Sequence, residues 1–467
     1  MAKKFYITTA IDYTNDVVHV GHSYQKILAD ALARYHRLLE ERVFFLTGTD
    51  EHGQKVEKSA KESGLPPKKF VDKIVKADKK EWKSLNLSYN RFIRTTDKDH
   101  IKFAQEIYLK SKASGDIYKA KYKGFYCEGC EGYISKHDLI NGHCPFHPNL
   151  EPLKIEEENY FFRLSKYQKF LEELLEKNKK LVIPEGKRKE ALSFVKRGLK
   201  DFAVSRPGVS WGIPVPDDPS HTIYVWFDAL INYLTYGVEE NCWPADVHVL
   251  GKDNLRFHAI YWPAMLKSAG YPLPKTILVH DFLTFNGQKI SKSLGNVIRP
   301  SELVKKFGTD AVRYFFLRFG PLQNDIDFTL EKIKEAYNAD LANGLGNLVA
   351  RIAKLCEKAN FKAPYCDDTY HHSRFKKFHK LMLEYKINEA LEFVWQKISQ
   401  ADKYINTSQP WLLKGEKLNR VLGHLVKEIR EIAILLKPFL PETAEKIAKQ
   451  FSHLKIKSAK PLFPRIQ

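Results

Sequence analysis

Two kinds of apolar pattern alternate over the first fifty residues, and this alternation restricts the fold more than any other feature. Strand-like residues fill Phe5–Thr9, and from Ser23 apolar residues recur at the i, i+3, i+4 and i+7 positions of an amphipathic helix. A second apolar run, Val43–Leu46, follows. Strand, helix and strand in this order predict a parallel, doubly wound α/β sheet of the Rossmann type.

The alternation is interrupted and later resumes. A Cys- and Gly-rich patch, an amphipathic helical pattern over Lys166–Leu181 and a Pro-rich stretch break it. Strand patterns return at Thr222–Trp226, Val247–Gly251 and Ile277–His280, and helical periods dominate from Glu331. We therefore expect a split sheet domain (1–115 and 216–280), an inserted domain (116–215), a loop region (281–330) and a C-terminal α-helical bundle (331–467).

Composition narrows the class of protein. The chain has 467 residues, of which 43% are hydrophobic, and no apolar run approaches the ~20 residues that span a bilayer. Its start lacks the apolar core of a signal peptide, so we expect a soluble, cytoplasmic protein. The net charge of +20 suggests a polyanionic partner, although a lysine-rich proteome would explain it equally well. Little sequence follows the last helical pattern, which suggests a monomer.

The tetrapeptide His19-Val-Gly-His22 stands between the first strand and the first helix. A helix amino terminus presents free N–H groups and a positive dipole end, which favour phosphate. Gly21 would let a nucleotide approach the backbone, and two imidazoles could donate hydrogen bonds to phosphate oxygens as charge develops. An ordinary helix-start turn is the alternative.

A second motif, Lys289-Ile-Ser-Lys292-Ser, lies in a Gly-bearing loop about 270 residues later. Two lysines flanking a serine suit a mobile clamp on a polyphosphate, and a solvated basic loop is the alternative. The two motifs bracket the split sheet domain, and their joint occurrence is far more specific than either one.

Metal-ligand spacing marks the inserted region. Cys127-x2-Cys130 and Cys144-x2-His147 supply three thiolates and one imidazole, the closed tetrahedral set of a structural zinc site. His137 and His143 compete as the fourth ligand, but the x2 spacing favours His147. A closed set leaves no open coordination position, so we expect no catalytic role for this metal.

The paired motifs resemble the HIGH and KMSKS motifs of class I aminoacyl-tRNA synthetases, and the chain resembles the methionyl-tRNA synthetases over nearly its whole length. Further matching segments are Thr8–Asp16, Thr47–Gly53, Tyr224–Tyr233, Gly251–His258 and the cysteine knuckle. The resemblance implies that the knuckle folds the connective domain near the acceptor end of tRNA.

The resemblance also implies a methionine pocket. Trp226, Ala229 and Tyr233 are spaced i, i+3 and i+7, so a helix following a strand at Ile223–Val225 would place them on one face. An aromatic–small–aromatic wall suits a thioether, although spacing alone favours plain core packing. The matching positions of the family's pocket in this sequence are Ala10, Ile11, Tyr13, Asp50, Trp226, Ala229, Tyr233 and His258.

Asp50 matches the carboxylate that holds the substrate ammonium, and Asp253 matches the ribose-binding acid. Both follow apolar strands, where such sheets bind ligands. Asn15, Gly21, Gly251, Asp253 and Lys292 are the implied ATP contacts. Asp12 and Asn254 depart from the family pattern, which usually has an uncharged residue and an aliphatic one there.

In the helical region, Asn347, Arg351 and Trp411 match the family's anticodon-reading elements. Asn347 and Arg351 are i, i+4 on a helix and can face one ligand. Trp411 could stack on an unpaired base, whereas a buried core tryptophan is the alternative.

The implied reaction is ATP-dependent activation of L-methionine to methionyl-adenylate, then transfer to the 3′-terminal adenosine of elongator and initiator methionine tRNA, giving Met-tRNA, AMP and pyrophosphate. His19, His22, Lys289 and Lys292 are the expected catalytic residues. Mg²⁺ is expected with ATP and one structural Zn²⁺ per chain.

Three other functions compete with this interpretation. A synthetase for another aliphatic amino acid would generally carry a larger editing insertion. A nucleotidylyltransferase would not need the helical domain, and a catalytically silent tRNA-binding paralogue would have no chemical reason to keep His19, His22, Lys289, Lys292 and Asp50.

Overall fold

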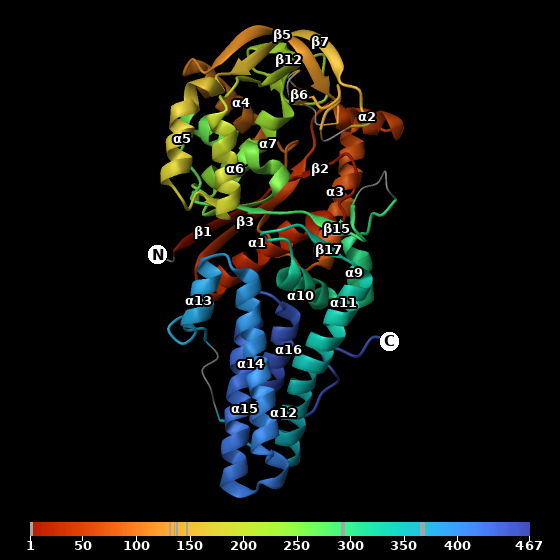
Figure 1. The fold of residues 1–467 in the computed structure, drawn as a ribbon, viewed down its shortest axis with the longest axis vertical. Coiled ribbons are helices and arrows are strands. Elements are labelled where there is room, and N and C mark those ends of the chain that lie inside the picture. The colour runs from red at the N-terminus through yellow and green to blue at the C-terminus, as the bar shows by residue number, and fades with distance from the viewer. Residues whose placement is uncertain are drawn as a thin grey trace.

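A computed structural model of the chain shows an elongated molecule (Figure 1). It describes residues 3–129, 132–134, 136, 139–145, 148–290, 295–364 and 369–467, with Lys289 described by its backbone only. The central sheet lies between a mainly antiparallel β region at one end and a group of long helices at the other. Within the described part of the chain, no helix combines the length and apolar character needed to cross a bilayer.

Seven strands form the central sheet, and all its pairings are parallel, which confirms the predicted α/β class. The order is β2-β3-β1-β13-β14-β8, and β4 also pairs with β3. The strands are β1 (Lys4–Thr9), β2 (Asp12–Tyr13), β3 (Arg42–Asp50), β4 (Arg91–Arg94), β8 (Val182–Ile183), β13 (Val247–Gly251) and β14 (Ile277–His280). Parallel strands end at one common edge, so β1, β3, β13 and β14 bring their carboxyl ends together.

Helix α1 (Val20–Leu38) packs across β1, β3 and β13. Its amino end differs from the prediction, which placed the start near Ser23. The helix begins at Val20 because imidazole nitrogens of His19 and His22 accept the first free N–H groups, a role usually played by Ser, Thr, Asp or Asn. His22 therefore lies inside the first helical turn.

Further helices pack around the sheet and on one another. They are α2 (Gln54–Glu62), α3 (Pro67–Ser84), α4 (Lys98–Ala113), α7 (Val225–Glu239), α8 (Trp262–Ser268), α9 (Pro300–Phe307) and α10 (Thr309–Phe319). Short 3₁₀ and π segments, at Lys252–Asn254 and Phe257–Tyr261, precede α8.

The inserted residues form two small sheets and a helical pair. The larger sheet is antiparallel in the order β6-β5-β7-β9, and the smaller has the order β10-β12-β11. Their strands are β5 (Ile117–Cys127), β6 (Gly132–Ile134), β7 (Leu153–Phe162), β9 (Phe202–Ala203), β10 (Ser205–Pro207), β11 (Pro214–Val215) and β12 (Asp218–Ile223). Helices α5 (Gln168–Lys177) and α6 (Glu185–Lys196) pack together, and β8 between them joins the central sheet beside β14.

The predicted strand at Thr222–Trp226 is wrong in its second half. Strand β12 ends at Ile223 and helix α7 begins at Val225, so Trp226 is helical. Strand β12 also pairs with β10 and β11 rather than with the central sheet. A short apolar run cannot by itself distinguish a buried strand from the start of a buried helix.

Helices dominate the last part of the chain. They are α11 (Leu330–Ala336), a π-helix (Tyr337–Gly346), α12 (Asn347–Lys358), α13 (Lys376–Leu383), α14 (Ile387–Ser408), α15 (Gly415–Leu436) and α16 (Pro441–Phe451). Helices α12, α14 and α15 lie side by side far from the sheet, and α16 packs on α15 (Figure 1). One continuous apolar core joins these helices to α1 and one face of the sheet, including Ile7, Leu28, Phe316, Leu425 and Ile447.

Candidate active site

The His19–His22 turn begins helix α1 at the carboxyl edge of the sheet. His19 is the N-cap residue, and its Nδ1 accepts the Gly21 N–H at 3.1 Å. Because Nδ1 is an acceptor, a neutral His19 carries its proton on Nε2. That N–H is the group with which His19 would donate a hydrogen bond to a phosphate oxygen as negative charge develops.

His22 lies beside His19, with ring centroids 4.2 Å apart. Its Nδ1 is 3.2 Å from both the backbone nitrogen and the carbonyl oxygen of His19. Burial, together with the positive charge of Lys26, lowers the pKa of His22 to about 4. His22 is therefore neutral at physiological pH and can act on phosphate as a donor rather than as a charge.

Gly21 makes room for the His19 ring. A Cβ atom at this position would lie 2.8 Å from His19 Cε1 and 2.9 Å from its Nδ1, closer than real side chains approach. The sequence predicts that Gly21 lets a nucleotide approach the backbone closely. The structure supplies a second reason for glycine here, since a larger residue would displace the His19 ring.

The loop of the second motif meets this turn. Ile290 is buried, and its Cδ1 would be 3.8 Å from a Cβ on Gly21. Lys289 ends β16 (Gln288–Lys289), which pairs with β15 (Leu283–Phe285); β15 also pairs with β17 (Ile326–Phe328). The Lys289 side chain and residues 291–294, which include Lys292, lie outside the described residues.

The chain beyond the loop is also tied to the His19–His22 turn. Val20 donates its N–H to the Ile298 carbonyl at 2.9 Å, and the Arg299 guanidinium donates to the carbonyls of Val17 and Val18. Two motifs about 270 residues apart therefore adjoin, as expected if both act on one substrate.

The proposed ammonium-binding residue lies at a strand end. Asp50 is the last residue of β3, is 6% exposed, and stands opposite Tyr13 in the β2–β3 register. Ala10 and Ile11 lie between β1 and β2, and Ala10 is buried. Four predicted methionine contacts thus gather around the ends of three adjacent strands.

Helix α7 supplies the aromatic side of this region. Trp226, Ala229 and Tyr233 all lie on α7, as the spacing predicted. The Tyr233 hydroxyl is 2.8 Å from His258 Nε2, while His258 Nδ1 is 2.9 Å from the Asn254 carbonyl. A carbonyl only accepts, so Nδ1 donates to it and Nε2 accepts from Tyr233.

Burial lowers the pKa of His258 to about 4, which agrees with this neutral tautomer. Trp226 stacks on Phe257 with ring centroids 3.8 Å apart and planes 3° apart. The pocket's aromatic residues are thus held by one another before any ligand is considered.

The expected nucleotide residues lie at the next strand end. Gly251 ends β13, and Asp253 follows it with its carboxylate exposed. A Cβ on Gly251 would lie 2.7 Å from Asp253 Oδ1, so glycine leaves space for that carboxylate. Asn15 is half-buried between Tyr13 and the His19–His22 turn.

The proposed anticodon residues lie in the distant helical part. Arg351 on α12 donates to Asp402, and also to Asn406 at 2.7 Å, both on the last turns of α14. Asn347 is exposed at the start of α12. Trp411 is 55% exposed, which excludes the alternative of a buried core tryptophan and leaves its ring available for stacking.

Comparison with known proteins agrees with this arrangement. A family model described as tRNA synthetases class I (M) matches residues 5–151 and 138–353. The methionine–tRNA ligase of Thermotoga maritima is 43% identical over 96% of this chain and 75% of its own length. The chain belongs to the methionyl-tRNA synthetases. The Caldanaerobacter subterraneus methionine–tRNA ligase is 44% identical over 96% of this chain and 74% of its own length.

Solved methionyl-tRNA synthetases share the fold over nearly the whole chain. The Mycobacterium tuberculosis enzyme in complex with methionyl-adenylate is 36% identical, with a TM-score of 0.92 over 99% of this chain and 100% of that one. Its apo form gives a TM-score of 0.86 at 33% identity over 100% of this chain and 99% of that one.

The structure adds a nucleotide-site candidate to this methionyl-tRNA synthetase that the sequence analysis missed. His280 ends β14 and stands opposite Gly251 in the parallel register. Its Nδ1 is 2.7 Å from the Asp281 carbonyl and must donate to it, which makes Nε2 an acceptor. Burial lowers the pKa of His280 to about 4, and Nε2 is buried without a hydrogen-bond partner among the described residues.

The position of His280 offered one sequence signal. It follows Ile277–Val279 at a strand end, the same kind of position as Asp50 and Gly251. A buried acceptor beside the proposed ribose site suits a donor such as an adenine amino or ribose hydroxyl group.

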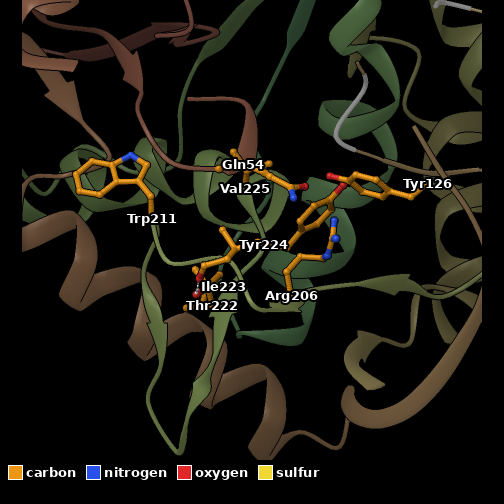
Figure 2. A pocket seen from close by; sticks show the side chains of 10 residues that line it. Gln54, Tyr126, Arg206, Trp211, Thr222, Ile223, Tyr224 and Val225 are labelled. Atoms are coloured by element: carbon orange, nitrogen blue, oxygen red, sulfur yellow. Dashed lines mark hydrogen bonds between the residues drawn. The ribbon is translucent and has the colours of Figure 1, made fainter. Parts of the chain in front are cut away.

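A shallow pocket lies between the sheet domain and the inserted sheets of this methionyl-tRNA synthetase (Figure 2). Gln54 and Trp211 line it together with Arg206 and Tyr126. The Trp211 indole donates to the Glu51 carbonyl at 2.5 Å, next to Asp50. The pocket thus borders the strand end that carries the proposed ammonium site.

Beneath this pocket, a buried carboxylate joins three elements. Asp228 on α7 lies 2.7 Å from His52 Nδ1 and 2.6 Å from His100 Nε2. Charge and hydrogen bonds from these imidazoles outweigh burial and lower the pKa of Asp228. This contact was not predicted from the sequence.

Two of the four predicted zinc ligands are described. Cys127 ends β5, and Cys127 and Cys144 are both buried. Cys130 and His147, like the alternative ligand His137, lie outside the described residues, whereas His143 is half-buried. Among the described residues, no group of three or more His, Cys, Asp and Glu side chains could hold a metal ion.

Proposed function

We propose that this chain activates L-methionine with ATP and transfers the methionyl group to methionine tRNA, both elongator and initiator, releasing AMP and pyrophosphate. The single observation that carries the proposal is the contact between the His19–His22 turn and the loop of Lys289–Ser293, through Ile290. That contact supports the joint action of the two motifs on one phosphate-bearing substrate.

In the first step, the methionine carboxylate attacks the α-phosphorus of ATP, and pyrophosphate leaves. The carboxylate is already ionised, so no general base is needed, and catalysis consists of positioning and charge stabilisation. His19, through its Nε2–H, and the neutral His22 would donate to phosphate oxygens. Lys289 and Lys292 would bind the phosphates as charges.

Methionine would lie between the strand ends and α7. Asp50 would hold its ammonium, and Tyr13 opposite Asp50 would close one side. Tyr233 donates its hydroxyl to His258, so both polar groups are satisfied and the thioether meets a wall of rings. Ala10, Ile11, Trp226 and Ala229 would complete the pocket.

ATP would lie across the ends of α1, β13 and β14. Asn15, Gly21, Gly251 and Lys292 are its proposed contacts, with Asp253 on the ribose and His280 as an added acceptor. Mg²⁺ bound with ATP would offset charge on the pyrophosphate, as is general for this family.

The second step needs tRNA at both ends of the molecule. A terminal adenosine hydroxyl, the 2′ in the resembled class, attacks the mixed anhydride. Asn347, Arg351 and Trp411 would read the anticodon from the far end of the helical part. This two-ended use supports the proposed division into a split catalytic domain (1–115 and 216–280), a connective domain (116–215), a loop region (281–330) and an anticodon-binding domain (331–467).

Zinc would serve the connective domain as a structural ion held by Cys127, Cys130, Cys144 and His147. Two buried thiols in a segment rich in turns fit a soft metal better than an apolar core. We also propose that the protein acts as a monomer.

ATP–pyrophosphate exchange tests the first step. Each of the twenty amino acids is assayed without tRNA, followed by aminoacylation of methionine tRNA. Exchange with methionine alone is expected. Exchange with another amino acid would overturn the pocket assignment, and exchange with none would revive the silent tRNA-binding paralogue.

A further inference from the structure

Lys26 and Asp12 form an ion pair that is almost wholly shielded from water. Lys26 Nζ lies 2.9 Å from Asp12 Oδ2, and the two side chains are 0% and 2% exposed. Lys26 is on α1, four residues after His22, and Asp12 is on β2, between Ile11 and Tyr13. Asp12 is thus a departure from the family pattern that has a dedicated partner in this chain.

The same ammonium joins three strand ends. Lys26 Nζ is 2.7 Å from the Ala10 carbonyl, 3.0 Å from Thr9 Oγ1 and 3.0 Å from Thr47 Oγ1. These three oxygens match the three N–H donors of the ammonium, and the Asp12 carboxylate beside it supplies the opposite charge. Contacts with the Lys26 side chain therefore fix the position of the Ala10–Tyr13 segment. This segment carries three of the proposed methionine contacts.

Charge makes the pair interdependent. Burial alone raises the pKa of Asp12 and lowers that of Lys26, while their mutual attraction opposes both effects. Removing one member of a buried pair leaves an uncompensated charge, whereas removing both does not. In the β2–β3 register Asp12 pairs with Thr49 and Tyr13 with Asp50, so a stranded Asp12 carboxylate would stand near the ammonium site.

We infer that Lys26 and Asp12 are positioning residues for methionine: their pair holds the Ala10–Tyr13 segment and neutralises Asp12, so that Asp50 receives the substrate ammonium. The inference rests on the proposed function. Neither residue touches the reacting atoms, and the effect should appear in methionine binding rather than in ATP binding.

Three variants test it: Lys26→Gln, Asp12→Asn and the double variant. The readout is ATP–pyrophosphate exchange at varied methionine and varied ATP. Lys26→Gln keeps two of the three N–H donors but removes the charge, and should raise the KM for methionine about tenfold with the KM for ATP within about twofold. Asp12→Asn should act in the same direction. The double variant should return to within about threefold of wild type, because no charge is stranded.

Two outcomes would overturn the inference: an unchanged KM for methionine in both single variants, or a double variant whose defect equals the product of the single ones. If Lys26→Gln does not fold, Asp12→Asn and the double variant still test the inference, because a double variant with a KM for methionine no lower than that of Asp12→Asn would overturn it. Asp30→Asn is the matched control, since Asp30 belongs to another buried ion pair of α1. It should lower stability without changing the KM for methionine.

Asp50→Ala separates this inference from the proposed function. If Asp50→Ala raises the KM for methionine and Lys26→Gln does not, only the positioning role fails. If Asp50→Ala has no effect, the pocket assignment itself fails.

Discussion

Arg313 and Asp30 form a buried ion pair that joins the central sheet domain to the helical part of the molecule. Arg313 Nη1 lies 2.8 Å from Asp30 Oδ2, and both side chains are 0% exposed. Arg313 also donates to the carbonyls of Phe439 at 2.8 Å and Pro438 at 3.2 Å, just before α16. One guanidinium on α10 therefore ties α1 to the turn between α15 and α16.

Arg313→Met should destabilise the protein by about 3–5 kcal/mol, because it removes one of the two guanidinium partners of the buried Asp30 carboxylate and leaves three buried carbonyls without this donor. Denaturant unfolding measures the effect. Lys68→Met is the control, since the Lys68–Asp72 pair is exposed and should change stability by less than about 1 kcal/mol. Equal effects in the two variants would contradict a special role for the buried pair.

His19→Asn separates helix capping from catalysis. Asparagine is a good N-cap residue and can accept the Gly21 N–H, but it does not reach the position of the His19 Nε2–H. We expect unchanged thermal stability and a fall of about 10²-fold in the kcat of ATP–pyrophosphate exchange. His19→Gln, which can place an N–H near that position, should retain more activity. Full activity in His19→Asn would mean that His19 only caps helix α1 and takes no part in catalysis.

His248 should make stability depend on pH. Its Nε2 accepts from the Trp262 indole at 3.3 Å, and its Nδ1 lies 2.6 Å from Thr8 Oγ1. An indole only donates, so His248 must stay neutral, and burial holds its pKa well below the usual value, with His258 lowering it further. In the unfolded chain the pKa of this histidine is about 6.5, so the unfolded chain binds a proton on His248 that the folded chain does not bind.

Below about pH 6.5 this histidine should remove about 1.4 kcal/mol of stability per pH unit as the pH falls. His248→Gln removes that proton uptake, so its free energy of unfolding should fall less steeply between pH 6.5 and 5. Guanidinium unfolding at several pH values measures both slopes. Parallel slopes for wild type and variant would contradict the assignment.

Trp411→Ala should affect tRNA and leave amino-acid activation intact. The ring is 55% exposed, so its loss should barely change thermal stability. Loss of one base-stacking contact of ~1–3 kcal/mol predicts a rise of about 5- to 150-fold in the KM for methionine tRNA. Trp411→Phe keeps a ring and should lose less. An equal loss of ATP–pyrophosphate exchange without tRNA in Trp411→Ala would contradict a role for Trp411 in tRNA binding alone. Normal exchange in Lys292→Ala would contradict a role for Lys292 in amino-acid activation.

Replacing Cys144 should reduce the amount of zinc bound to the protein. Cys144→Ser is expected to lower the bound zinc measured by mass spectrometry and to lower the melting temperature. Cys356→Ser is the matched control, because Cys356 is also buried but burial raises its pKa to about 12, so it remains a thiol. Full zinc content in Cys144→Ser would exclude that ligand.

Much of the fold could be predicted because it follows from short-range pattern. Strands at Phe5–Thr9, Val43–Leu46 and Ile277–His280 are contiguous apolar runs, and the helix after His19 has a strong 3.6-residue period. The errors occurred where a local run was ambiguous. Thr222–Trp226 has the composition of a strand, yet its second half begins a helix, because packing on β3 and β4 decides between the two.

The candidate site divides in the same way. Residues in compact motifs, such as His19, His22 and Asp50, could be named from the sequence and the family resemblance. His280 was missed because a histidine after three apolar residues has no distinctive spacing, and only the β13–β14 register places it beside Gly251. Trp411 could not be assigned to core or surface until its exposure was known.

The family, the parallel α/β class and the paired phosphate-binding motifs could be recognised from the sequence alone, because each depends on residues that are close together in the chain. Tertiary structure decided that Lys26 neutralises Asp12, that Ile290 meets Gly21 and that Arg313 joins α1 to the last helices. These contacts connect residues 14, 269 and 283 positions apart. Such contacts cannot be predicted from local pattern, because two groups far apart in the chain meet only when the fold packs their segments together and excludes water between them.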